Sequence, residues 1–266
     1  MLGNKSTGGL DSKTYAITSG KGGVGKTSCA VNLSITLSRA GFKVLLIDAD
    51  MGLANVDLLT GVSAPHTIEE VIRGEASIFD ALAEGPEGLT LLTAGSGLED
   101  ISTIAPDKAG KFEKELLKLE NAFDFVFIDT GAGISANVID FVFMADEVIV
   151  IMTPEPTAFA DAYAMVKIVT LKEPSLKVSV IINQSSGEHA SRIIFDKFRE
   201  IVEKFLGRNV VYHGCIAQDK TVAESVMRQI PLALFASKSP AMQSIRKIAR
   251  NMLGLESPKP RTIFNR

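Results

Sequence analysis

Short runs of apolar residues, many of them β-branched, recur along the chain and alternate with segments whose apolar residues follow helical spacing. The runs are Tyr15–Thr18, Lys43–Asp48, Leu89–Thr93, Phe125–Asp129, Glu147–Met152, Lys177–Asn183 and Val210–Ile216. Such continuous runs, rather than strict apolar/polar alternation, are typical of parallel strands buried on both faces. We therefore predict an α/β fold with a single doubly wound, mainly parallel sheet of about seven strands and helices on both faces.

Three helix boundaries can be placed between these runs. Residues 26–40 have helical apolar spacing, and Gly41 supplies a stop. Thr67 followed three residues later by Glu70 forms a capping box that starts a second helix. Pro106 is expected to open a third, which runs to about Asn121.

The length and composition fit one folded domain. The chain has 266 residues, of which 46% are hydrophobic and 22% charged, the balance of a globular protein with a packed core. We place the folded domain at residues 14–256. The ends, residues 1–13 and 257–266, are expected to be flexible, because the first is rich in Gly and Ser and the second contains two prolines.

Charge and cysteine content argue against several classes of protein. A net charge of −3 gives no reason to expect direct binding to nucleic acid. Cys29 and Cys215 make no disulfide framework, and the three histidines lack metal-ligand spacing. No apolar run approaches the ~20 residues that span a bilayer, and residues 1–10 lack the apolar stretch of a signal peptide. We therefore expect a protein of the reducing cytoplasm.

A glycine-rich loop follows the first predicted strand and leads directly into a predicted helix. Residues 20–27, GKGGVGKT, fit the phosphate-binding pattern G-x-x-x-x-G-K-[ST] in its required context. Lys26 can reach β- and γ-phosphates, and Thr27 can place its hydroxyl on Mg²⁺. The nucleotide contacts expected here are Gly22, Gly23, Val24, Gly25, Lys26, Thr27 and Ser28. The alternative is a glycine-rich turn without a ligand.

Acidic residues stand at the carboxyl ends of two predicted strands, where open α/β sheets bind ligands. Asp48 and Asp50 end the second strand and point the same way if the strand persists that far. Asp129 follows four apolar residues, a layout that suits an aspartate holding Mg²⁺ through water. We assign Thr27, Asp48 and Asp129 to the metal. Helix capping or a turn is the alternative for each aspartate, and the one we favour for Asp57.

A second lysine, Lys21, follows the first glycine of the loop, and the motif GKGGVGKT resembles the deviant Walker A motif of the ParA/MinD ATPases. The resemblance covers about residues 14–255 and implies a P-loop ATPase that uses ATP and Mg²⁺. It implies that Lys21 reaches across a nucleotide-sandwich dimer to the phosphates of the other subunit; the alternative is a bystander charge. It also implies that Asp50 positions the attacking water, so the expected catalytic residues are Lys21, Lys26 and Asp50. The residues after Asp129 resemble the family's switch II.

The same resemblance implies a base site. Asn183, at the end of the sixth predicted strand, matches the family's adenine-reading asparagine, and a buried strand-end amide is the alternative. The other edge of the base would be covered by Ala217, Gln218 and Asp219. A preference for ATP over GTP rests on this resemblance alone.

Three passages resemble the flagellar-number regulators called FlhG, FleN or YlxH more than the division-site protein MinD: residues 129–135, 154–163 and 183–184. This resemblance implies an ATP-dependent homodimer that regulates flagellar number or placement. Its partner would be a GTPase like FlhF or a flagellar transcription activator. The alternatives are a MinD-like membrane ATPase, a ParA-like protein that partitions DNA or cargo, and a metabolic ATP-dependent enzyme.

The last predicted helix is amphipathic. It opens at Ser239-Pro240 and carries Arg246, Lys247 and Arg250 opposite an apolar face. In the resembled family such a helix can lie on the inner face of the cell membrane, which gives a possible peripheral membrane contact. Docking of the apolar face on the protein's own sheet is the interpretation we favour.

Overall fold

A computed structural model describes residues 12–50, 55–93, 114–119 and 122–255. Its strands are β1 Lys13–Ser19, β2 Val44–Ala49, β3 Ala83–Glu84, β4 Thr90–Leu92, β5 Phe125–Ala132, β6 Glu147–Met152, β7 Lys177–Ser185 and β8 Val211–Ala217. Its helices are α1 Lys26–Arg39, α2 Asn55–Thr60, α3 Ile68–Arg73, α5 Ala136–Val142, α6 Pro156–Lys172, α7 Glu188–Leu206, α8 Lys220–Met227, α9 Leu232–Phe235 and α10 Pro240–Met252, with a 3₁₀ turn at Pro86–Gly88.

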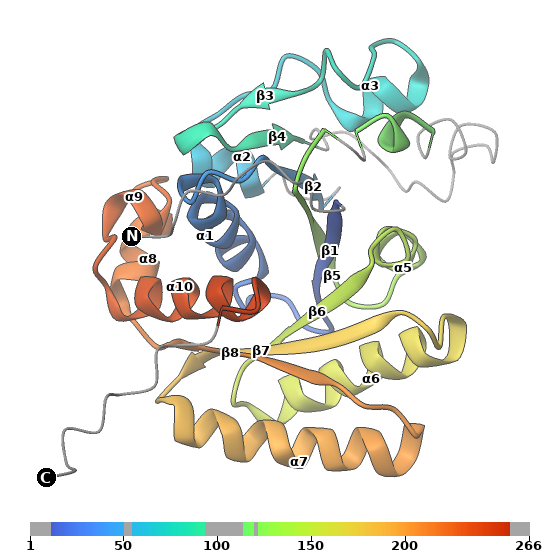
Figure 1. The fold of residues 1–266 in the computed structure, drawn as a ribbon, viewed down its shortest axis with the longest axis vertical. Helices are drawn as coiled ribbons and strands as arrows, with labels where there is room; N and C mark the ends of the chain where they lie inside the picture. Colours follow the sequence, from blue (N-terminus) through green and yellow to red (C-terminus); the bar gives the residue numbers. More distant parts are fainter. Residues whose placement is uncertain (1–11, 51–54, 94–113, 120–121, 256–266) are drawn as a thin grey trace, which may run out of the picture.

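The strands form one sheet in the order β3-β4-β2-β5-β1-β6-β7-β8 (Figure 1). All neighbouring pairs are parallel except β3 with β4. The predicted α/β fold with a doubly wound, mainly parallel sheet is confirmed. The sheet has eight strands in the described residues rather than about seven, because a two-residue strand, β3, pairs antiparallel at one edge.

Alternate residues of the central strands pack against different helices. On β6, Ile149 and Ile151 belong to an apolar core with α1 and α10, whereas Val148 and Val150 belong to a second core with α5, α6 and α7. In a third core, the face of β2 and β5 that is turned away from α1 packs against α3. Both faces of the sheet are therefore buried, which is why its strands are continuously apolar in sequence.

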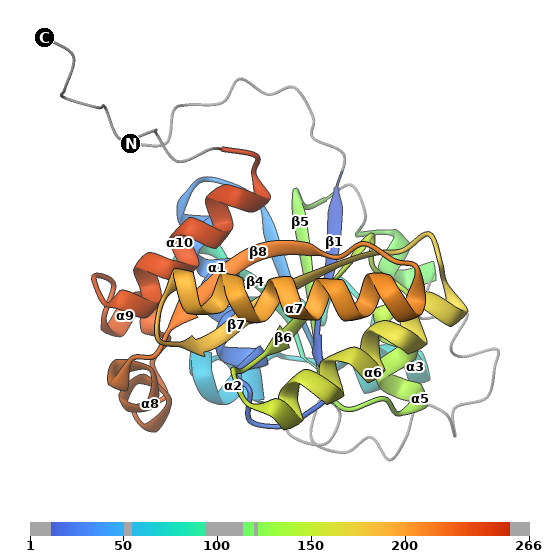
Figure 2. The same ribbon diagram turned by 90° about the horizontal axis from the view of Figure 1, so that it is seen from below.

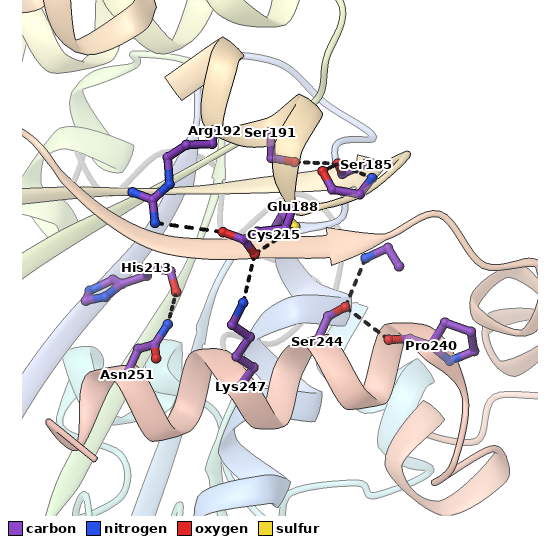
Figure 3. Close-up of polar contacts among 12 residues, drawn as sticks. Ser185, Glu188, Ser191, Arg192, His213, Cys215, Pro240, Ser244, Lys247 and Asn251 are labelled. Carbon is purple, nitrogen blue, oxygen red and sulfur yellow. Dashed lines mark hydrogen bonds and ion pairs between the residues drawn. The ribbon is translucent and has the colours of Figure 1, made fainter. Parts of the chain in front are cut away.

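Helix α10 docks on the protein's own core, as we favoured. Its apolar residues are buried against α1 and β8: Ala241, Met242, Ile245, Ile248, Ala249 and Met252. Two polar side chains of α10 form hydrogen bonds with the backbone of β8 (Figure 3). Ser244 accepts from the Ala217 amide at 3.2 Å, and Asn251 donates to the His213 carbonyl at 2.9 Å. The apolar face of α10 is therefore covered by the protein itself, and a peripheral membrane contact stays a prediction. No helix among the described residues is long and apolar enough to cross a bilayer.

The predicted helix ends are borne out where the structure describes them. Helix α1 spans Lys26–Arg39, and Thr67 and Glu70 form both hydrogen bonds of the capping box of α3. The helix expected to open at Pro106 is described only in part: residues 114–117 are helical, whereas its predicted start lies outside the described residues. The stretch 51–54 after β2 and the ends 1–11 and 256–266 also lie outside them.

Candidate functional site

The glycine-rich loop connects β1 to α1 at the carboxyl edge of the sheet, and α2 and α8 lie at the same end of the molecule (Figure 2). Gly23 and Gly25 adopt φ values of 77° and 92°, a region that glycine enters without strain. No side chain caps the start of α1 and its first turn has no acidic residue. The first amides of α1 are thus left for an anion, as at helix ends that bind phosphate.

Two contacts fix the shape of this loop. At Gly20, an added Cβ would lie 2.3 Å from the Asp161 carbonyl oxygen, so the loop packs directly on α6. At Gly25, an added Cβ would lie 2.3 Å from Asn183 Nδ2, which donates a 2.7 Å hydrogen bond to the Val24 carbonyl. Asn183 therefore holds the loop from the end of β7, and its predicted contact with adenine stays a prediction.

Lys26 and two aspartates are buried together behind the loop. Asp48 and Asp129 are register partners on β2 and β5, and both are fully buried. Burial lowers the pKa of Lys26, an effect opposed by Asp129 and then by Asp50. The predicted cluster of one lysine and several carboxylates therefore exists in space.

The two buried aspartates differ in their hydrogen bonds. Asp48 accepts from the amides of Asp50 and Val56, each at 3.1 Å, and burial raises its pKa to about 7. Neither oxygen of Asp129 has a donor in hydrogen-bond geometry within the described residues. Burial first, and Asp48 second, raise the pKa of Asp129 to about 8, while Thr27 and Lys26 partly offset the rise. An unpartnered buried carboxylate of this kind is costly unless something else neutralises it.

This donor set fits Mg²⁺. The predicted ligands Thr27, Asp48 and Asp129 offer hard oxygen atoms, and both Asp129 oxygens lack partners. Within the described residues no group of three or more His, Cys, Asp or Glu side chains surrounds a metal position. That is compatible with Mg²⁺, which uses one or two carboxylates and completes its shell with water and phosphate oxygens.

Asp50 lies between the start of α2 and the end of β5. Its carboxylate lies 3.5 Å from Asn55 Nδ2, and a Cβ added to Gly131 would lie 3.5 Å from its Oδ1. Asp50 thus faces the last residues of β5, which belong to the stretch after Asp129 that resembles switch II. Asp57 lies in the first turn of α2, and its buried Oδ1 has no hydrogen-bond partner among the described residues, so its capping role stays a prediction.

Lys21 points to the amino-terminal end of α6. Its Nζ lies 2.8 Å from Glu155 Oε2 and 3.4 Å from Thr157 Oγ1, and both charged side chains are solvent-accessible. The hydrogen bond to Glu155 raises the pKa of Lys21. Sequence reasoning missed Glu155 and Thr157, although both follow β6 at the carboxyl edge where ligand sites form.

The loop expected beside the base is tied to neighbouring helices. Asp219 caps α8 by accepting from the Thr221 amide at 2.9 Å, and it accepts from the Ala241 amide of α10 at 3.1 Å. The Gln218 side chain is exposed, while its amide donates to the Ser185 carbonyl. Base contacts by Ala217, Gln218 and Asp219 stay a prediction.

Known proteins resemble this chain over most of its length. The family model described as AAA domain matches residues 12–182. The chain is 33% identical over 240 residues to the antiactivator FleN of Pseudomonas aeruginosa, covering 90% of this chain and 86% of FleN. It is 33% identical over 241 residues to the flagellum site-determining protein YlxH of Helicobacter pylori, covering 90% and 81%. The solved MinD cell division protein of Aquifex aeolicus superposes with a TM-score of 0.76 at 28% identity, covering 94% and 100%.

Proposed function

Because this chain belongs to the MinD/ParA family of P-loop ATPases, we propose that it is an ATP-dependent dimerising switch that regulates flagellar number or placement. The observation that carries the proposal is that the phosphate loop lies next to three buried charged groups, Lys26, Asp48 and Asp129. Such a site suits a nucleotide with its cation. The flagellar role is supported by the two relatives, the antiactivator FleN and the flagellum site-determining protein YlxH.

In this proposal the chain's own groups divide the work of binding. The amides of the loop and the start of α1 bind the phosphates, and Lys26 contacts the β- and γ-phosphates. Thr27, Asp48 and Asp129 hold Mg²⁺ directly or through water. The bound cation neutralises charge that develops on the phosphates, and it also offsets the cost of burying Asp129 without a partner.

Asp50 is the proposed water-positioning residue. Its place beside Asn55 of α2 and Gly131 of β5 lets it respond to the two segments that border the γ-phosphate position in P-loop proteins. An alanine there removes the positioning group and leaves the phosphate loop intact. Asp50→Ala is therefore expected to bind ATP and to persist as a dimer.

Lys21 is the proposed group that acts across the dimer. Its ion pair with Glu155 is solvent-accessible, so water and salt screen the attraction between the two charges. Lys21 can therefore leave Glu155 at little cost when a second copy presents phosphates. A charge supplied in trans to a transferring phosphoryl group can raise the rate by about 10³ to 10⁵.

Sedimentation and calorimetry test this switch in the purified chain. With saturating Mg-ATP, we expect the wild type to dimerise and hydrolyse ATP slowly, and Asp50→Ala to remain dimeric. Lys26→Ala should lose nucleotide binding, whereas Lys21→Ala should bind ATP without dimerising. Lys167→Ala, an exposed change on α6, is the matched control. A monomeric Asp50→Ala protein, or a Lys21→Ala protein that dimerises like the wild type, would contradict the assignment.

The cellular role needs a separate readout. Deleting the gene in its own organism should change the number or position of flagella counted by electron microscopy, and Lys26→Ala should fail to restore them. The similarity to MinD makes misplaced division septa the informative alternative outcome. Normal flagella together with minicells would replace the flagellar proposal by a division-site role while leaving the switch intact.

A further inference from the structure

A groove of about 350 Å³ lies between the last turns of α1 and the side of α10, two helices that run side by side (Figures 1 and 2). Its floor is apolar and is formed by Leu37, Met242, Ala249 and Leu253. The first three are almost fully buried. The floor is therefore recessed between two helices rather than presented on a flat surface.

Three arginines surround this floor. Arg39 is bonded to Glu87 at 2.8 Å and to the Ala233 carbonyl, and Arg246 donates to the Ser237 carbonyl. Arg250 is exposed, and its guanidinium has no hydrogen bond or ion pair with any described residue. Within the described residues, none of the side chains that line the groove is acidic. The groove thus combines an apolar floor with the charges of Arg246 and Arg250, which have no ion-pair partner among the described residues, whereas Arg39 is paired with Glu87.

We propose that this groove binds an acidic, amphipathic segment of a partner protein, with an apolar side chain seated on the floor and a carboxylate on Arg250. A guanidinium presents paired donors that match a carboxylate, and such charge-assisted hydrogen bonds are stronger than neutral ones. Arg246 is already oriented by its own hydrogen bond, so it adds positive potential without a large loss of side-chain freedom, whereas the charge of Arg39 is offset by Glu87.

The groove suits a protein segment better than a lipid surface or nucleic acid. The apolar face of α10 is buried in the protein, so α10 offers a membrane mainly charge, at about 1 kcal/mol per basic residue near the surface. A nucleic-acid backbone would use the arginines but leave the recessed floor empty. An amphipathic segment uses both features, as helices do when they lie in apolar grooves.

This site is independent of the proposed nucleotide switch. Helix α1 has 14 residues, and at 1.5 Å per residue its last turn lies roughly 20 Å from the phosphate loop. Binding in the groove needs neither ATP nor a second copy of the chain. The same measurement on Lys26→Ala should therefore give an unchanged affinity, which keeps failure of this inference distinct from failure of the switch.

The test measures direct binding to the full chain without nucleotide. The probe is a fluorescein-labelled 15-residue helical peptide with leucine on one face and glutamate on the other, compared with a peptide in which lysine replaces each glutamate. Arg250→Glu reverses the free charge, and Thr36→Phe fills the groove from α1 while keeping all three arginines. Lys197→Glu is the matched control, because Lys197 is exposed on α7, on the other face of the sheet.

We expect saturable binding of the acidic peptide by fluorescence anisotropy, at least about tenfold weaker for Arg250→Glu and for Thr36→Phe, and unchanged for Lys197→Glu. Urea unfolding of each variant shows that the loss is not a loss of fold. Equal binding of the basic peptide, or an Arg250→Glu protein that binds like the wild type, overturns the proposal. Arg250-dependent binding to phosphatidylglycerol vesicles or duplex DNA, with none to the acidic peptide, overturns it in favour of that ligand.

Discussion

Replacing Asp129 by asparagine removes a proposed metal ligand. In the nucleotide-free protein, we expect the difference in unfolding free energy between the variant and the wild type to shift in favour of the variant as the pH rises from 5 to 8. The reason lies in the free energy of burying the carboxylate. Burial and Asp48 raise the pKa of Asp129 to about 8, above the ordinary 3.8 of an aspartate. The folded protein then holds the proton more tightly than the unfolded chain, so this stabilisation is complete below about pH 4 and is lost as pH rises through 8.

The size of the effect follows from that pKa. Between pH 5 and pH 8 the unfolded carboxyl is ionised while the folded one is mostly protonated, so the wild type loses about 4 kcal/mol of unfolding free energy. Coupling to Asp48 and entry of water reduce the part that asparagine removes, and we expect the variant to gain about 2–4 kcal/mol on the wild type over this range. The buried amide costs about 1–3 kcal/mol at every pH, so it leaves the difference unchanged.

Urea unfolding at pH 5 and pH 8, with a chelator and without nucleotide, measures this difference. Asp140→Asn, an exposed change on α5, is the control and should shift the unfolding free energy equally at both values of pH. The reasoning is refuted if the unfolding free energy of Asp129→Asn differs from that of the wild type by the same amount at pH 5 and at pH 8. The charge of Asp129 would then be compensated in the nucleotide-free protein.

Three further substitutions test separate contacts. Gly25→Ala should disrupt nucleotide binding in calorimetry far more than Gly23→Ala, because both glycines have positive φ but only the first abuts Asn183, at 2.3 Å. Thr67→Ala breaks the capping box of α3 and should cost about 1 kcal/mol in urea unfolding; no change would mean that the cap carries no net stability. Asn251→Ala removes a side-chain bond to the edge of β8 and should cost about 1 kcal/mol and speed hydrogen exchange in α10, and unchanged exchange would contradict that role.

The fold was largely predictable because its main signal is local. Each buried parallel strand is a continuous apolar run, and six of the eight strands coincide with a predicted run to within about two residues at each end, a normal margin for strand limits. Strand β5 continues to Ala132, three residues beyond its predicted run. Strand β3 was missed because two residues, Ala83 and Glu84, are too few to show any periodicity.

The candidate site was predictable where topology alone brings residues together. Parallel strands end at one edge, so Asp48 and Asp129 could be placed at the same edge once their strands were recognised. That they are direct register partners depends on the sheet order, which puts β2 beside β5. Contacts between side chains far apart in sequence were not predictable. Lys21 meets Glu155 across 134 positions, and Asn183 meets Val24 across 159, and both depend on how α6 and β7 pack beside the loop. The unpartnered state of Asp129 likewise follows from its surroundings and not from its identity.

The bonding of Ser244 and Asn251 to β8 has a consequence for how copies of this protein can associate. Open sheet edges recruit strands from other molecules, which leads to fibrous aggregates that are hard to reverse. Here α10 occupies backbone groups at one edge, and the strand at the other edge, β3, is only two residues long. Growth by strand addition is therefore blocked at both edges in the described structure. Contacts between copies are left to side-chain surfaces, which can separate again, and the dimerising switch proposed above would need contacts of that kind.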